Sequence, residues 1–193
     1  MRPLTSLVRL AVFAPILALA TLVTTEHDAH ALGPIDIEAG LRAGFATKPS
    51  SNDANPFGLG IGGRAGVGIF HLYGGISAIH YFGEKQDITS QVGTTRVSFS
   101  STLLGLELGY SITAIPLLTI RPQLGIGNAA FSFQDDSTSH LYLEPGVVVL
   151  ISLGLVYVGA DANVLVVPGI DQGDGSTKTD TSFTLHAQAG IKF

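Results

Sequence analysis

The sequence contains no cysteine, which excludes disulfides, thiolate catalysis and a lipoprotein anchor. Charged residues are scarce, at 13% of the chain, and the net charge of -5 argues against nucleic acid as a partner. The chain is instead rich in apolar residues and has a positive mean hydropathy, a combination usually produced by membrane helices. Its 24 glycines and its short alternating runs favour strands over helices.

The first 31 residues have the pattern of a secretory signal peptide. Arg2 and Arg9 supply positive charge before an apolar core at 10–23, which is short for a spanning helix. Ala29-His30-Ala31 then supplies a small-x-small cleavage site. We therefore predict a cleaved signal peptide at 1–31 and one exported domain at 32–193, with an uncleaved membrane anchor as the alternative.

The C-terminal segment Ser182–Phe193 alternates without a break between apolar and polar or glycine positions. Side chains of a strand point alternately to its two faces, so this segment predicts a strand with one apolar and one polar face. The apolar positions are Phe183, Leu185, Ala187, Ala189, Ile191 and Phe193.

Seven further segments predict strands by similar patterns: Ile35–Ala46, Phe57–Ile69, Tyr73–Phe82, Arg96–Tyr110, Leu117–Phe133, His140–Ile151 and Leu155–Val166. Long polar connections at 47–56, 83–95, 134–139 and 167–180 alternate with short turns at 70–72, 113–116 and 152–154. The run 73–82 has blurred alternation, and a change of phase predicts a bulge at 100–103. An apolar helix over 146–160 is the alternative to the hairpin there.

Aromatic residues gather near the predicted strand ends, which suggests two interfacial girdles. The expected girdle residues are Phe45, Phe57, Phe99 and Phe183 towards the long connections, and Phe70, Tyr73, Tyr110 and Phe193 towards the short turns.

With eight strands, alternating connection lengths and a final phenylalanine, residues 32–193 resemble the small outer-membrane barrels typified by the OmpA membrane domain and OmpX. The resemblance implies an all-β fold, an eight-stranded antiparallel up-and-down transmembrane β-barrel. It also implies that the barrel-assembly machinery reads a C-terminal signal formed by Phe183, Leu185, Ile191 and Phe193. No peptidoglycan-binding domain is expected. A soluble, lipocalin-like barrel is the structural alternative, but the charged phase is too narrow and glycine-rich to coat its surface.

The charged residues of the strands fall on the phase opposite to the apolar one, so they are expected inside the barrel. They are Glu38, Arg42, Arg64, Glu107, Arg121, Glu144 and Asp161. We predict a paired network that fills a lumen too narrow for bulk water, with a charge gate as the alternative. A row of inward glycines at 58–68 is expected to make room for bulky side chains from opposite strands.

Three possible chemical sites are weak. His80 resembles the histidine of a lipid A deacylase segment, but Phe82 stands where the nucleophilic serine belongs. Asp171–Ser176 misses the spacing of a calcium loop, and the single histidines do not form a metal-ligand pattern. We therefore predict no enzyme, no cofactor and no metal site.

The sequence predicts an integral outer-membrane protein with a structural or loop-presenting role and a plugged lumen. A narrow gated channel is the alternative, and a lipid-modifying enzyme is a weaker one. Expected partners are outer-membrane lipid, lipopolysaccharide and an extracellular ligand at the loops, with the protein acting as a monomer.

Overall fold

The computed structural model describes residues 35–49, 55–90, 93–115, 117–133, 136–171 and 177–193. The predicted signal peptide and most of the Asp171–Ser176 segment lie outside these residues. Within the described part of the chain, no helix is long and apolar enough to cross a membrane.

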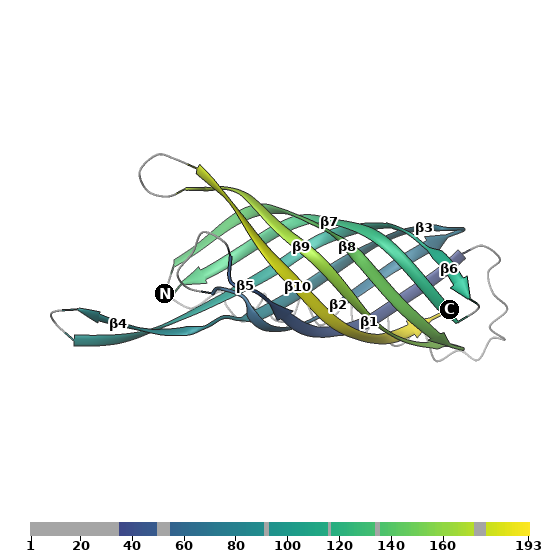
Figure 1. The fold of residues 1–193 in the computed structure, drawn as a ribbon, viewed down its shortest axis with the longest axis horizontal. Helices are drawn as coiled ribbons and strands as arrows, with labels where there is room; N and C mark the ends of the chain where they lie inside the picture. The colour runs from purple at the N-terminus through teal and green to yellow at the C-terminus, as the bar shows by residue number, and fades with distance from the viewer. Residues whose placement is uncertain (1–34, 50–54, 91–92, 116, 134–135, 172–176) are drawn as a thin grey trace, which may run out of the picture. The chain divides into compact units, whose positions relative to one another are not determined.

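The described residues form ten strands, of which eight build a closed barrel (Figure 1). The ten are β1 (Ile35–Ala46), β2 (Gly58–Ile69), β3 (Leu72–Phe82), β4 (Lys85–Ser90), β5 (Gly93–Tyr110), β6 (Ile112–Ile115), β7 (Leu118–Phe133), β8 (Asp136–Leu153), β9 (Val156–Asp171) and β10 (Thr177–Lys192). Of these, β4 pairs only with β5, and β6 pairs only with β7. The alternative of a helix over 146–160 is wrong, because these residues form the β8–β9 hairpin.

Two pairings close the barrel. The first strand joins the last, from Glu38 opposite Lys192 to Ala46 opposite Thr184. On the other side β5 pairs with β7, while β4 extends from β5 as a hairpin. Every neighbouring pair is antiparallel, so the predicted eight-stranded up-and-down barrel is confirmed.

The two ends of the barrel differ in how far the strands extend. We call the end at Ala46, Phe82 and Phe133 the loop end, and the end at Ile69 and Tyr110 the turn end. The predicted long connections are shorter than expected, because strands occupy much of 83–95, 134–139 and 167–180. The predicted turn at 113–116 likewise contains most of the short strand β6. Turn chemistry therefore marked the connections correctly but not their limits.

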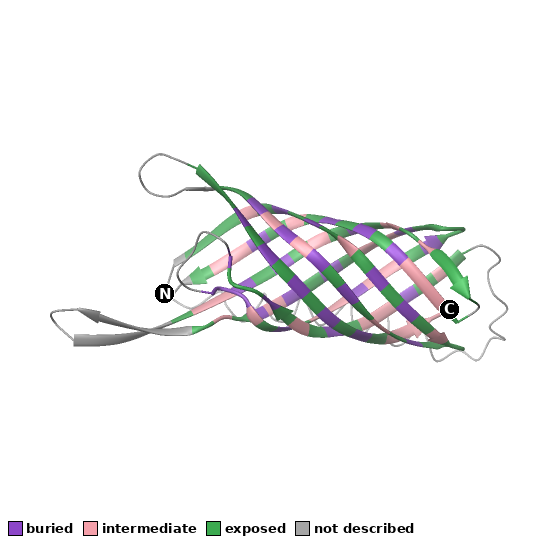
Figure 2. Cartoon of the chain, in the orientation of Figure 1, coloured by how far each residue is buried: buried purple, intermediate pink, exposed green. Residues whose placement is uncertain are grey.

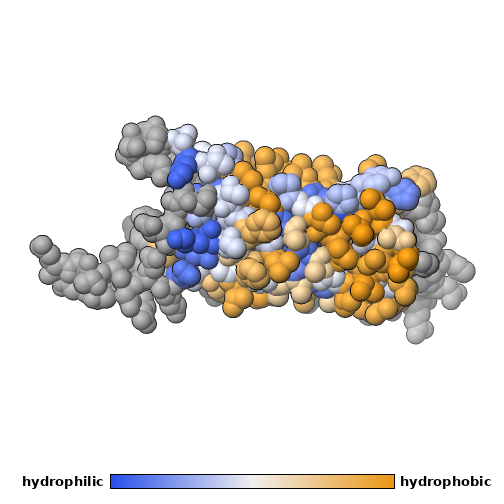
Figure 3. All heavy atoms as spheres, viewed as in Figure 1, coloured by the Kyte–Doolittle hydropathy of each residue, from blue (hydrophilic) through white to orange (hydrophobic). Residues whose placement is uncertain are grey.

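Buried and exposed residues alternate along the strands (Figure 2). Many exposed strand residues are large and apolar, and the charged residues of the strand centres are buried inside. Leu41 on β1 is 75% exposed and the next residue, Arg42, is 3% exposed. On the face drawn in Figure 3, apolar atoms cover much of the barrel wall. A water-soluble barrel has the reverse arrangement, with its apolar residues inside.

The predicted bulge at 100–103 is absent, since β5 keeps one register with β3 and with β7 through this region. Leu103 lies on the inward phase of β5 and is buried, whereas Leu104 is exposed. The pattern was misread because the inner wall is itself apolar near the loop end. The predicted girdle is wrong at Phe57, which is buried in this apolar part of the inner wall, and at Tyr73, which is buried in the lumen beside Arg64 and Arg121.

Candidate functional site: the barrel lumen

Four buried tyrosines lie in the lumen against bare backbone. A methyl group added to the facing glycine would overlap each tyrosine. Tyr73 lies on Gly66 and Gly75, Tyr81 on Gly60, Tyr142 on Gly105, and Tyr157 on Gly40 and Gly190. The inward glycines therefore do make room for bulky side chains. The bulky groups come from the same or nearby strands, however, and not from opposite strands as expected.

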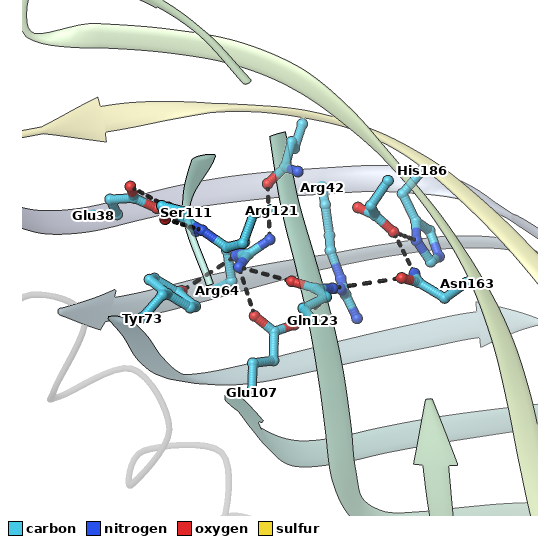
Figure 4. Close-up of polar contacts among 12 residues, drawn as sticks. Glu38, Arg42, Arg64, Tyr73, Glu107, Ser111, Arg121, Gln123, Asn163 and His186 are labelled. Atoms are coloured by element: carbon cyan, nitrogen blue, oxygen red, sulfur yellow. Dashed lines mark hydrogen bonds and ion pairs between the residues drawn. The ribbon is translucent and has the colours of Figure 1, made fainter. Parts of the chain in front are cut away.

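Near the turn end, Arg121 of β7 binds Glu38 of β1 across the lumen (Figure 4). The two terminal guanidinium nitrogens of Arg121 donate to the two carboxylate oxygens at 2.9 and 2.7 Å. Its Nε donates to the Ser111 hydroxyl at 3.0 Å, and its guanidinium lies 3.9 Å from the ring centre of Tyr73. Both charges are buried, so each depends on the other to offset its lost hydration.

The middle of the lumen is organised around Glu107 of β5, which binds two arginines. Arg64 approaches one carboxylate oxygen at 2.8 Å and Arg42 the other at 3.3 Å. Arg64 also donates to the side-chain oxygens of Gln188 at 3.3 Å and Gln123 at 3.4 Å. This cluster joins residues of five strands, so it holds opposite walls of the barrel in one register.

A second polar cluster lies nearer the loop end and contains a buried histidine. His186 Nδ1 lies 2.6 Å from Asp161 and its Nε2 lies 2.7 Å from the Tyr81 hydroxyl. Asn163 donates to the same Asp161 oxygen at 2.7 Å. A proton on Nδ1 is then donated to Asp161, and Nε2 accepts from Tyr81.

Glu144 lies beside this cluster and accepts from the Thr184 hydroxyl at 2.9 Å. Asn163 also donates to that hydroxyl, at 3.3 Å, so Thr184 links the carboxylate to the cluster around His186.

Towards the loop end the lumen contains a layer of buried apolar side chains. The layer consists of Ala46, Phe57, Ile79, Tyr81, Leu103, Ala129, Tyr142, Leu165 and Val167, with Phe131 packed against it. Phe57 makes edge-on contacts with Tyr81 and Phe131, at centroid distances of 5.5 and 5.7 Å. We call this set the apolar layer.

A short strap places Phe57 in the apolar layer. The side-chain amide of Asn55 donates to the carbonyl of Ala46, and its side-chain oxygen accepts from the backbone N–H of Phe57. The Pro56 carbonyl accepts from the Ser101 hydroxyl at 3.0 Å. Gly58 then adopts a φ of 74°, which favours glycine and lets the chain leave the strap into β2.

Comparison with solved structures agrees with this geometry. No protein-family model matches the chain, and no curated protein matches its sequence. In fold the chain is similar to Neisserial surface protein A, at 15% identity over 83% of this chain and 97% of that one, with a TM-score of 0.59. It is also similar to a major outer membrane protein from Thermus thermophilus, at 15% identity over 81% of this chain and 99% of that one, with a TM-score of 0.50.

The chain has the fold of a small outer-membrane β-barrel. At this level of identity the likeness concerns the fold alone. What the lumen and the loop end do must therefore be argued from the residues of this chain.

The structure places all seven predicted lumen charges inside the barrel, each at most 4% exposed. It pairs five of them with one another: Arg42 and Arg64 with Glu107, and Arg121 with Glu38. The other two, Glu144 and Asp161, bind Thr184 and His186.

The predicted C-terminal signal residues lie on the outer wall of β10 and at the end of the chain. Phe183, Leu185 and Phe193 are exposed, and Ile191 is partly exposed. The geometry does not test their role in assembly, which stays a prediction.

Sequence reasoning missed the tyrosines, Gln188 and His186 as members of the network. Their inward phase was readable, because His186 and Gln188 occupy the polar positions of the C-terminal strand. Their partners were not readable, since Arg64 and Gln188 are 124 residues apart in sequence. The apolar layer gave no separate signal, because apolar residues were assigned to the outer wall.

The described lumen side chains are buried, and five of their charges are paired with one another. Among the residues that the structure describes, no group of three or more His, Asp or Glu side chains could hold a metal ion. The buried polar atoms without a hydrogen-bond partner in the described protein include Arg42 Nε, Tyr157 OH, Asp161 Oδ2 and Gln188 Nε2.

Proposed function

We propose that the protein is an integral outer-membrane protein whose sealed barrel is a scaffold for structures presented at the loop end, without enzymatic activity. The observation that carries the membrane assignment is the inverted barrel: its outer wall is apolar and its charges are buried inside. In water such a wall is a large aggregation-prone surface, whereas in lipid it is the favourable arrangement. The likeness in fold to outer-membrane proteins supports the same placement.

The seal is proposed to have two parts with different physical bases. The ion pairs around Glu38 and Glu107 occupy the lumen with side chains that are bound to one another. A passing ion would have to displace one partner of such a pair. The apolar layer adds a barrier that water enters unfavourably, as at hydrophobic constrictions in channels. Phe57 is its key residue, because the strap holds the ring between Tyr81 and Phe131.

Presentation at the loop end is supported by strands that continue beyond the closed part of the barrel. The β4–β5 hairpin and the β9–β10 hairpin project from this end in Figure 1. Described residues at their base are polar and exposed, for example Glu84 and Lys178. These hairpins would contact an extracellular ligand. Replacing them with short turns should remove the protein's physiological effect while the barrel still folds.

The seal is tested by single-channel conductance of the protein reconstituted in planar bilayers. Wild type and Phe82→Ala should be silent, because Phe82 neighbours the apolar layer in sequence but points outward and is exposed. Phe57→Ala alone should stay silent while the ion pairs remain. Phe57→Ala combined with Arg121→Ala should produce discrete conductance steps, since this double variant removes the central ring of the layer and an ion pair of the lumen. Steady conductance by folded wild-type protein would refute the sealed scaffold.

A narrow channel is the second candidate, supported by the buried polar atoms that lack protein partners. Arg42 Nε and Gln188 Nε2 lie in the middle of the lumen, where water would satisfy them. For a channel, Arg121→Ala should change the wild-type conductance, whereas for a sealed scaffold it should leave the bilayer silent as long as the apolar layer is intact.

Biogenesis and the absence of catalysis belong to the same proposal. Export through a cleaved signal peptide, folding by the barrel-assembly machinery, and contact with lipopolysaccharide as a monomer follow from an outer-membrane location. An unchanged lipid A mass in a strain that overproduces the protein is expected. A modified lipid A would contradict the non-enzymatic role.

A further inference from the structure

The turn end of the barrel exposes large apolar side chains at each of its described turns. Phe70 is 74% and Leu72 66% exposed at the β2–β3 turn, and Leu153 and Leu155 are 58% and 52% exposed at the β8–β9 turn. Ile112, Ile115 and Leu117 are likewise exposed around β6. Turns that stand in water are normally polar, so this end needs a partner that accepts apolar groups.

Charge is distributed unequally between the two ends. The turn segments 70–72, 110–118 and 152–156 contain no Asp, Glu, Lys or Arg. The connections at the loop end carry many, including Lys48, Glu84 and Lys178. A partly exposed charged pair at the turn end is Lys192 with Asp36, 3.0 Å apart at the junction of β1 and β10. A partner for the turns is therefore expected to be apolar and not to carry matching charges.

Backbone hydrogen bonds close the rim of the turn end from one turn to the next. The N–H of Ser111 donates to the carbonyl of His71, that of Ser152 to Leu117, and that of Lys192 to Leu155, at 2.6 to 2.9 Å. Phe193 and Ile37 exchange two further bonds, at 2.9 and 3.0 Å. These backbone groups therefore need no hydrogen bonds from water. A segment can enter the apolar part of a membrane only when its backbone groups are satisfied within the protein.

The height of the apolar wall fixes where the membrane must lie. On β8 the outward residues are apolar from Leu141 to Leu153, and polar at Ser137 and Ser139. Twelve residue steps of about 3.3 Å, tilted by about 40°, span roughly 30 Å, which is the thickness of a typical hydrocarbon core. A hydrocarbon core of this thickness that begins at Leu141, next to Ser139, ends at Leu153 in the β8–β9 turn.

We propose that the turn end is immersed in the inner lipid interface, so that Phe70, Leu153 and their neighbours contact lipid instead of standing in the aqueous compartment. The occupant of this surface is lipid because the exposed apolar residues of these turns continue the lipid-facing wall with no charged residue in the turn segments. The proposal rests on the proposed membrane location of the barrel. Its new content is that only the loop end of the protein presents a surface to water.

Tryptophan fluorescence tests this directly, because the chain contains no tryptophan. Three variants place one probe at different heights on the outward face of β8: Ser137→Trp, Val147→Trp and Leu153→Trp. Phe70→Trp repeats the turn measurement at a second turn, where the aromatic ring is already exposed. Each full-length variant is expressed, purified from membranes and reconstituted in phosphatidylcholine vesicles, with folding checked by heat-dependent gel mobility. The lipids are unlabelled, brominated near the headgroup, or brominated near the chain end.

We expect a blue-shifted emission and strong quenching by brominated lipid for Val147→Trp, greatest with bromine near the chain end. Leu153→Trp and Phe70→Trp should also be quenched, with bromine near the headgroup more effective. Ser137→Trp should be red-shifted and quenched by aqueous iodide instead.

Two other outcomes have distinct meanings. If Val147→Trp is quenched by lipid but both turn probes are quenched only by iodide, the turns stand in water and the inference is wrong, while the membrane location stands. If Val147→Trp escapes lipid quenching in folded protein, the proposed membrane location itself fails.

Discussion

The two ends of this barrel differ in the polarity of their lumen and of their outer surface. At the loop end the lumen contains apolar side chains such as Phe57 and Leu103, and hairpins with polar residues extend beyond the end of the barrel. Towards the turn end the lumen holds the ion pairs of Arg121 and Arg64, and the outer surface is apolar to the tips of the turns. Alternation along a strand therefore does not by itself say which face is polar. The position along the barrel axis decides that as well.

The largest expected effect comes from breaking the ion pair of the turn half. Arg121→Ala leaves Glu38 buried without its bidentate partner and should lower the free energy of unfolding by about 3–5 kcal/mol. Urea titration of vesicle-inserted protein, followed by gel mobility, measures this.

The matched control replaces both charges with apolar residues of similar size, as Arg121→Met with Glu38→Leu. This double variant should recover most of the loss, because no buried charge remains unpaired. If Arg121→Ala is as stable as the wild type, the Arg121–Glu38 ion pair does not stabilise the turn half of the barrel.

The next effect concerns the outer wall and its asymmetry between the ends. Val147→Arg places a charge in the middle of the apolar wall and should cost about 2–4 kcal/mol, with a cost of up to about 1 kcal/mol for Leu153→Arg at the interface. Ser137→Arg at the loop end should cost close to nothing. The same urea titration ranks the three, and equal values for Leu153→Arg and Ser137→Arg would remove the difference between the ends.

A smaller change in stability is expected when an inward-facing glycine, compared with an outward-facing one, is replaced by alanine. A methyl group on Gly66 would lie 2.5 Å from the Tyr73 hydroxyl oxygen, and the guanidinium groups of Arg64 and Arg121 both lie over that ring. Gly66→Ala should therefore destabilise the barrel by about 1–3 kcal/mol. Gly74→Ala is the control, since its new methyl meets only Leu108, at 4.0 Å, and should be neutral or slightly stabilising. Equal stabilities would show that the tyrosine shifts freely.

The fold followed from the sequence because period-two alternation is a local signal, clean in Ile35–Ala46 and in the C-terminal strand. The same signal placed Arg121 and Glu38 inside the barrel. Pairing could not be predicted, because it depends on the register of strands that are far apart in the chain. Phe57 and Tyr73 were misplaced for a different reason: an aromatic side chain can be accommodated by the lipid or by the lumen, and its identity does not distinguish the two.

The long sequence separation within the lumen network also bears on the order of assembly. Arg121 and Glu38 are 83 residues apart and lie on strands from opposite halves of the chain. Their strands face each other once β1 has joined β10, so an open sheet would leave Arg121 and Glu38 unpaired on one face. Lipid opposes entry of such an intermediate strongly. Joining the first and last strands and crossing the bilayer should therefore be one concerted event, which makes the β1–β10 seam the step that commits the chain to the membrane.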